Sequence, residues 1–265
     1  MVPFDHLQAG RKPAGQETAG VCAILLAMQM PLTIAVSQPS CRPRDVSANA
    51  QTHALAIRAA RARVVVFPEL SLTGYELDAD PISLTDDVLE PIVKACATTN
   101  SVALVGAPVK ERKGMHIATL RVGTDGIEVA YRKSFLGGDE ADRFSAGDGA
   151  VALDVDGWRL GMGICKDTGV PEHIRDVAAL DVDVYVAGLV HLPEELFVQD
   201  ERGATIAREC DAYVAFASFA GPTGGGFTRT AGASTIWSPS GVVLARADTE
   251  PGSVARATVR HPNAR

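Results

Sequence analysis

The chain has 265 residues, of which 46% are apolar and 22% are charged, so it can fold as an ordinary globular protein with a large core. Its formal net charge of −7 is spread without long runs, which gives no sign of a nucleic-acid-binding surface. No stretch of the sequence approaches the ~20 consecutive apolar residues that a membrane-spanning helix needs.

We expect residues 1–29 to be an extension, either disordered or upstream of a native start at Met28 or Met30. Basic residues followed by VCAILLAM resemble a weak signal peptide, but the apolar core is short and no small-residue cleavage site follows it. Export is therefore the alternative interpretation. The next stretch, PLTIAVSQ, is typical of a first strand, so residues 30–265 are predicted to form a single domain.

The first half of this domain alternates between short apolar runs, typical of buried strands, and longer segments with apolar residues at helical spacing. In chain order, the pattern predicts strand 32–38, helix 46–61, strand 64–67, helix 84–99 and three consecutive strands at 102–107, 115–122 and 127–133. A polar, glycine-rich loop at 137–149 follows.

The second half repeats this order. It begins with strands 151–155 and 158–164, which form a hairpin at Asp156-Gly157, and continues with helix 171–180, strand 182–187, helix 194–210, strand 213–218, strands 231–237 and 242–247 joined at Pro239-Ser240-Gly241, and strand 253–259. Each half therefore has helix–strand units together with antiparallel strands. Two sheets, each covered by helices on one face and packed against the other sheet, would make a layered α/β sandwich.

Three reactive side chains follow predicted strands directly. The segment WRLGMGICKDTGVPE delivers Cys165 to the end of a buried strand, and Gly169 and Pro171 then end the strand and open a helix. Backbone N–H groups at such a turn favour negative charge, so this thiol is a candidate nucleophile. Glu69 follows the strand at 64–67, and Lys133 ends the strand at 127–133.

These three residue types together fit attack on a carbonyl-like carbon. Cys165 would be the nucleophile, Glu69 the proton acceptor, and Lys133 a cation beside the developing negative charge. Unperturbed pKa values of ~4.3 and ~8.5 make proton transfer from Cys to Glu uphill by about 5.7 kcal/mol. We therefore expect a largely closed site, in which burial raises the pKa of Glu69 and the cation favours the thiolate.

Other types of site fit less well. A papain-like enzyme would pair Cys165 with His173 or His191, but His173 falls about two turns along the following helix. The six histidines are scattered singly, and the five cysteines are odd in number and lack a C-x-x-C pair. The sequence thus predicts no metal, no cofactor and a reducing, cytoplasmic location. The glycine-rich stretch 221–226 lacks the Lys-Ser/Thr of a phosphate loop, so we expect a mobile loop near the mouth of the site.

Over roughly residues 32–258, the chain resembles the nitrilase superfamily of carbon–nitrogen hydrolases, in its amidase-like branch. The matching strings are FPELSLTGYE (67–76), YRKSFLGGDEADRFSAGD (131–148), GICKDTGVPE (163–172) and GASTIWSPSGVVLA (232–245), with a weaker fifth match in ECDAYV (209–214). The resemblance implies a four-layer αββα sandwich that assembles as a homodimer or a higher homo-oligomer. It also implies that the chain uses no cofactor.

The resemblance assigns roles to the reactive residues. Glu69, Lys133 and Cys165 match the family's Glu-Lys-Cys triad, with Glu69 as general base and Cys165 as nucleophile. A second family glutamate falls on Glu140, where it would position Lys133 and the substrate. The backbone N–H of Lys166 would complete the oxyanion hole.

Some positions depart from the family pattern. The residue after the nucleophile, commonly aromatic, is Lys166, whose cation could lower the thiol pKa, attract an anionic substrate or simply face solvent. His191 stands where the family has an aromatic or polar residue, and it is either a pocket wall or a structural histidine. Tyr75, Gly188 and Phe219 are further candidates for the pocket lining.

We therefore expect a thiol-dependent hydrolase that cleaves a non-peptide C–N bond of a small amide or N-carbamoyl compound. The reaction would pass through a thioester on Cys165 and release an acid with ammonia or an amine. There are two alternatives. The same triad could hydrolyse nitriles, or the chain could be a catalytically silent member of the family that binds a small molecule.

Overall fold

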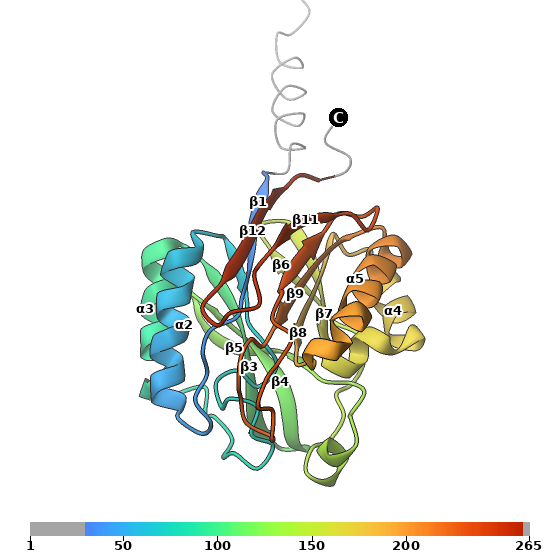
Figure 1. The fold of residues 1–265 in the computed structure, drawn as a ribbon. Helices are drawn as coiled ribbons and strands as arrows, with labels where there is room; N and C mark the ends of the chain where they lie inside the picture. Colours follow the sequence, from blue (N-terminus) through green and yellow to red (C-terminus); the bar gives the residue numbers. More distant parts are fainter. Residues whose placement is uncertain (1–29, 262–265) are drawn as a thin grey trace, which may run out of the picture.

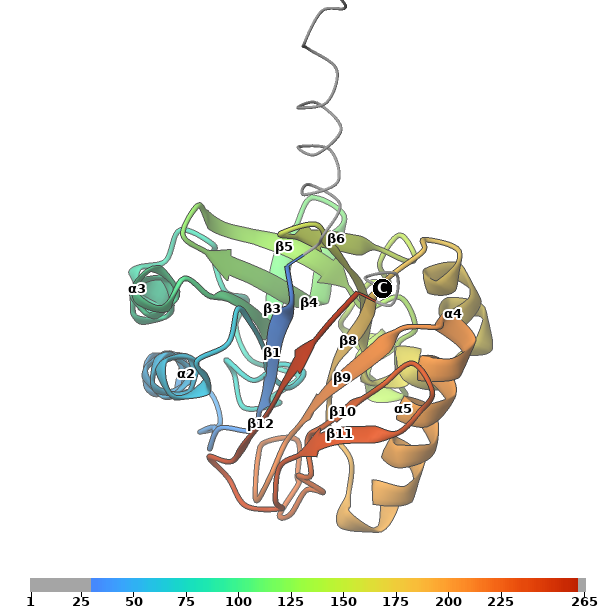
Figure 2. The same cartoon turned by 90° about the horizontal axis from the view of Figure 1, so that it is seen from above.

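The computed structural model describes residues 30–261, which form two six-stranded sheets packed face to face with helices on both outer sides (Figure 1). The predicted extension 1–29 lies outside the described residues. Figure 2, seen from above, shows α2 and α3 against one sheet and α4 and α5 against the other. This is the predicted four-layer αββα sandwich.

The first sheet has the strand order β12-β1-β2-β3-β4-β5, and the second has the order β11-β10-β9-β8-β7-β6. The strands are β1 (Leu32–Ser37), β2 (Val64–Val66), β3 (Val102–Glu111), β4 (Gly114–Gly123), β5 (Gly126–Arg132), β6 (Ala152–Val155), β7 (Trp158–Ile164), β8 (Val184–Leu189), β9 (Tyr213–Ser218), β10 (Thr235–Trp237), β11 (Val243–Arg246) and β12 (Val254–Val259). The α-helices are α2 (Val46–Ala60), α3 (Glu90–Thr99), α4 (Pro171–Ala178) and α5 (Leu196–Cys210).

Successive side chains of each strand alternate between the core between the two sheets and the layer under the helices. In β1, Ile34 belongs to the core between the two sheets, whereas Ala35 faces the helices α2 and α3. Successive side chains of a strand point to opposite faces, so strands covered on both sides are apolar throughout. β2, with the sequence VVV, is completely buried for this reason.

Parallel pairing places the reactive residues at one end of the sandwich. β1, β2 and β3 run parallel in the first sheet, and β7, β8 and β9 run parallel in the second. The ends of parallel strands meet at one edge of a sheet, and ligand sites form there in α/β folds. Glu69 follows β2 and Cys165 follows β7, so both residues lie at such ends.

Several element boundaries differ from the sequence prediction. The predicted helix 84–99 begins only at Glu90, because Asp86 caps a short 3-10 turn (Asp87–Leu89) and Pro91 lies in the first turn of α3. The predicted strand 231–237 is shortened to β10, since Gly232 and Ala233 both have positive φ angles. The hairpin at Asp156-Gly157 is confirmed, with φ angles of 53° and 84°.

Within residues 30–261, no helix has both the length and the apolar character that crossing a membrane requires.

Candidate active site

Cys165 lies on a sharp turn at the end of β7. The residue has a φ angle of +40°, which is uncommon for a residue with a side chain. It opens a 3-10 helix (Cys165–Gly169), and the Thr168 hydroxyl donates to its carbonyl oxygen at 2.6 Å. The thiol Sγ lies 3.6 Å from the carbonyl oxygen of Val190. The turn therefore places Cys165 at the end of β7, where the sequence predicted it, with its sulfur against the Val190 carbonyl.

Lys133 joins the two predicted glutamates. Its ammonium Nζ lies 2.7 Å from Oε1 of Glu69 and 2.7 Å from Oε1 of Glu140. All three side chains are buried, with residue exposures of 1% for Glu69, 1% for Lys133 and 5% for Glu140. The second oxygen of Glu140 accepts the backbone N–H of Gly137. The cation is thus fixed between two carboxylates that originate 64 and 7 residues away along the chain.

One oxygen of Glu69 is unused. Oε1 accepts from Lys133, whereas Oε2 is buried and has no hydrogen-bond partner among the described residues. A buried carboxylate oxygen without a donor is costly for folding. Such an orphan is typical of a group that exchanges a proton with a substrate or a nucleophile.

Burial governs the protonation of the cluster. It raises the pKa of the Glu69 carboxyl to about 7, although the Lys133 ammonium opposes the change. Burial also lowers the pKa of Lys133, but the negative charges around it, first that of Glu69, outweigh this effect and raise the pKa overall. Lys133 therefore stays a cation.

Burial has the largest effect on the thiol. It raises the pKa of Cys165 to about 12, helped by the charge of Glu69. The cation of Lys133 lowers this pKa, as the sequence predicted, but by less than burial raises it. Because the pKa of Glu69 is about 7, this carboxylate can accept the thiol proton as the sulfur attacks.

Two glycines position the backbone of Glu69. A Cβ on Gly106 of β3 would lie 2.3 Å from the Leu70 nitrogen, and one on Gly188 of β8 would lie 2.6 Å from the Glu69 nitrogen. The chain that carries Glu69 therefore passes closely against one glycine of each sheet. Gly188, a predicted pocket residue, contacts this backbone; its role in substrate binding stays a prediction. Gly106 was missed, because a glycine inside a strand gives no sign of what approaches it.

We expect Gly188→Ala to lower kcat roughly 100-fold, since the added methyl group would displace Glu69 by a few tenths of an ångström or more. Gly123→Ala is the matched control, because the atoms nearest to its methyl group would be those of the Asp125 and Arg121 side chains and not of the backbone. Steady-state kinetics on both folded variants test this. A Gly188→Ala enzyme with full kcat would mean that the close contact does not position the base.

Tyr75 lies beside the cluster. Burial raises its pKa far above the usual value, and the charges of Glu69, Cys165 and Glu140 add to the effect. Its ring makes edge-on contacts with Phe219 and Phe227, at centroid distances of 6.2 and 5.4 Å. These aromatic residues pack in one cluster with Cys165, and their role in lining a substrate pocket stays a prediction.

The glycine-rich loop lies against the segment that carries Tyr75. The hydroxyl of Thr223 and the N–H of Gly224 both donate to the carbonyl oxygen of Gly74, at 2.9 and 2.7 Å. The predicted location near the reactive cluster agrees with these contacts. The mobility of the loop stays a prediction.

The two basic residues near Cys165 face other partners. Lys166 donates from Nζ to the carbonyl oxygen of Leu136. His191 is buried, with Nδ1 3.4 Å from the side-chain oxygen of Gln199, and burial lowers its pKa. These contacts favour the second of the two interpretations from the sequence, a structural histidine.

Histidine–thiol and metal sites are not formed by the described residues. The only hydrogen bond of the Cys165 thiol within residues 30–261 goes to Val190. His173 packs against the rings of Tyr131, Phe135 and Tyr185. No group of three or more metal-ligating side chains that could hold an ion occurs in this part of the chain. The four cysteines it contains are free thiols.

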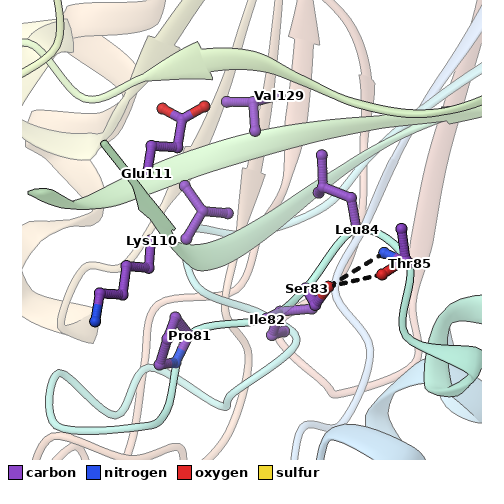
Figure 3. A pocket seen from close by; sticks show the side chains of 9 residues that line it. Pro81, Ile82, Ser83, Leu84, Thr85, Lys110, Glu111 and Val129 are labelled. Carbon is purple, nitrogen blue, oxygen red and sulfur yellow. Dashed lines mark hydrogen bonds between the residues drawn. The ribbon is translucent and has the colours of Figure 1, made fainter. Parts of the chain in front are cut away.

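A separate surface pocket of about 360 Å³ lies between the loop 81–85 and strands β3 and β5 (Figure 3). Its wall includes Ile82, Leu84, Lys110 and Val129, and none of the triad residues. It is therefore distinct from the reactive cluster.

Comparisons with known proteins show the family and the fold of the chain. The model of the carbon–nitrogen hydrolase family matches residues 33–265. A protein described as a hydrolase in the pqqF 5′ region of Pseudomonas protegens is 29% identical over 226 residues, covering 82% of this chain and 79% of that protein. The omega-amidase YafV of Escherichia coli is 29% identical over 188 residues, covering 70% and 72%. An amidase of the nitrilase superfamily from Nesterenkonia has the same fold, with a TM-score of 0.78, 21% identity and coverage of 89% and 93%.

Proposed function

This chain belongs to the carbon–nitrogen hydrolase family, and from that premise we propose that it hydrolyses a small amide or N-carbamoyl compound through a thioester on Cys165. The observation that carries the proposal is the buried Glu69-Lys133-Glu140 cluster. Oε2 of Glu69 has no hydrogen-bond partner among residues 30–261, and the charge of this carboxylate acts on the Cys165 thiol. The relatives described as a hydrolase and an omega-amidase support amide hydrolysis in general.

The first half-reaction forms the thioester. Sγ of Cys165 bonds to the amide carbon while Oε2 of Glu69 takes the thiol proton, since the resting thiol is neutral. The negative charge on the former carbonyl oxygen is stabilised by the Lys133 ammonium and by the backbone N–H of Lys166. The C–N bond then breaks as Glu69 returns the proton to nitrogen, and ammonia or an amine leaves.

The second half-reaction uses the same groups. Glu69 removes a proton from water, whose oxygen bonds to the thioester carbon. The C–S bond breaks, the acid is released and Glu69 returns the proton to sulfur. Glu140 holds Lys133 at the same place through both halves.

Ammonia release tests the proposal, on a panel of small aliphatic, dicarboxylic-acid and N-carbamoyl amides with matched nitriles. Cys165→Ala is the blank. Turnover that needs Cys165 and prefers amides supports the proposal, and the best substrate identifies the acyl group. Turnover of nitriles without the matching amides would replace it by nitrile hydrolysis. Silence on the whole panel, with a saturable ligand whose binding survives Cys165→Ala, would identify a binding protein.

We expect kcat/KM to fall as the pH falls through about 7. Burial raises the pKa of Glu69 to about 7, and a protonated Glu69 cannot accept the thiol proton, so activity is lost on the acid side. A pH profile of kcat/KM on the best amide measures this limb. An acid limb near pH 4, where an unperturbed glutamate titrates, would contradict the raised pKa of Glu69.

A further inference from the structure

Lys133 and Cys165 reach the site from different sheets. Lys133 follows β5 at the edge of the first sheet, and Cys165 follows β7 in the second. The spacing between them therefore depends on how the two sheets are held together at this end. A side chain that bonds to both strand ends would fix the distance between Lys133 and Cys165.

Asp167 makes this contact. Its Oδ2 accepts the backbone N–H of Ile164 at 2.9 Å and the Tyr131 hydroxyl at 2.8 Å, and its Oδ1 accepts the backbone N–H of Phe135 at 2.8 Å. Ile164 directly precedes Cys165, and Tyr131 and Phe135 lie two residues to either side of Lys133. The Asp167 side chain thus bonds to both strand ends, and the residue is completely buried.

We propose that Asp167 is a positioning residue, whose carboxylate sets the distance and orientation of Cys165 relative to Lys133. The inference rests on the proposed function. It goes beyond that function because Asp167 acts on the reacting groups indirectly, through the Tyr131 hydroxyl, through the backbone N–H groups of Ile164 and Phe135, and through its charge on Glu69.

The chemistry of the contact favours a carboxylate. Three donors converge on two oxygens, and an ionised carboxylate has acceptor sites for all of them. An asparagine side chain would present an NH₂ group to at least one of these donors and would lose that bond. The titratable groups that face Asp167 are Tyr131, His173 and Tyr185, and its charge also acts on Glu69.

The test compares Asp167→Asn with two other variants. Asp167→Asn is expected to lower kcat roughly 100-fold with KM within about twofold, because small displacements of reacting groups cost this much. Alkylation of Cys165 by chloroacetamide should slow in parallel. The acid limb of kcat/KM should move to lower pH, because the charge of Asp167 raises the pKa of Glu69. Tyr131→Phe, which keeps the charge, should slow alkylation severalfold without moving the limb.

Asp183→Asn is the matched control. Asp183 accepts the backbone N–H of Arg159 at 2.8 Å, near the other end of β7, and pairs with His261 at 2.7 Å, so this variant changes the contacts of a carboxylate away from the site. It should lower the melting temperature and leave kcat, the alkylation rate and the acid limb unchanged.

Two results would overturn the proposal. One is an Asp167→Asn enzyme that matches Asp183→Asn in all three readouts. The other, decisive if Asp167→Asn does not fold, is a Tyr131→Phe protein whose Cys165 alkylates at the wild-type rate. The alkylation rate needs no substrate turnover, so it tests Asp167 even if the chain proves not to be an amidase.

Discussion

Replacing Glu69 with glutamine is expected to lower kcat/KM at least about 1,000-fold while leaving the fold intact. Glutamine has nearly the same shape and keeps an oxygen for the 2.7 Å contact with Lys133. It cannot take a proton, however, and the Cys165 thiol is held neutral by burial. Without a base in place, the sulfur has no acceptor for its proton as it attacks.

The measurement is ammonia release from the best amide by the purified variant, together with its thermal unfolding. Glu128→Gln is the matched control, because Glu128 lies on β5 with an exposed side chain and, among residues 30–261, pairs only with Arg121, at 3.6 Å. It should retain full activity. If Glu69→Gln and Glu128→Gln turned over at similar rates, the role of Glu69 as the base would be refuted.

Replacing Lys133 with methionine is expected to remove activity and to destabilise the fold by about 3–5 kcal/mol, because it leaves buried carboxylates without their cation. Lys133 is the shared partner of Glu69 and Glu140. The loss should grow as the pH rises through about 7 and above, since the pKa of Glu69 is already raised by burial and protonation relieves its uncompensated charge.

Urea unfolding of the variant at pH 6 and pH 8 measures both effects. Lys113→Met is the control, since Lys113 forms an exposed ion pair with Asp148 at 2.9 Å and should contribute less than about 1 kcal/mol. A Lys133→Met protein as stable as Lys113→Met at both values would mean that the buried carboxylates find other partners or stay protonated.

The sequence by itself indicated the strands and placed the candidate reactive residues at their ends. Glu69 and Cys165 each follow an apolar run, and such runs are visible locally because a buried strand needs apolar side chains. Lys133 follows β5, whose side chains are mostly half-buried. The motifs around them were specific enough to indicate the family and its sandwich fold. The boundaries of α3 and β10 were wrong, because a capped 3-10 turn and two residues with positive φ angles leave the apolar pattern unchanged.

Only the tertiary structure decided how these residues meet and in which protonation state. Asp167 bonds to the backbone of Phe135, and Gly106 and Gly188 pack closely against the Glu69 segment. These contacts join residues far apart in the chain, and the periodicity of the sequence does not specify such partners. The raised pKa of the Cys165 thiol also depends on the packing. Desolvation depends on how completely two sheets close over a group, which is a property of the packed molecule and not of any one segment.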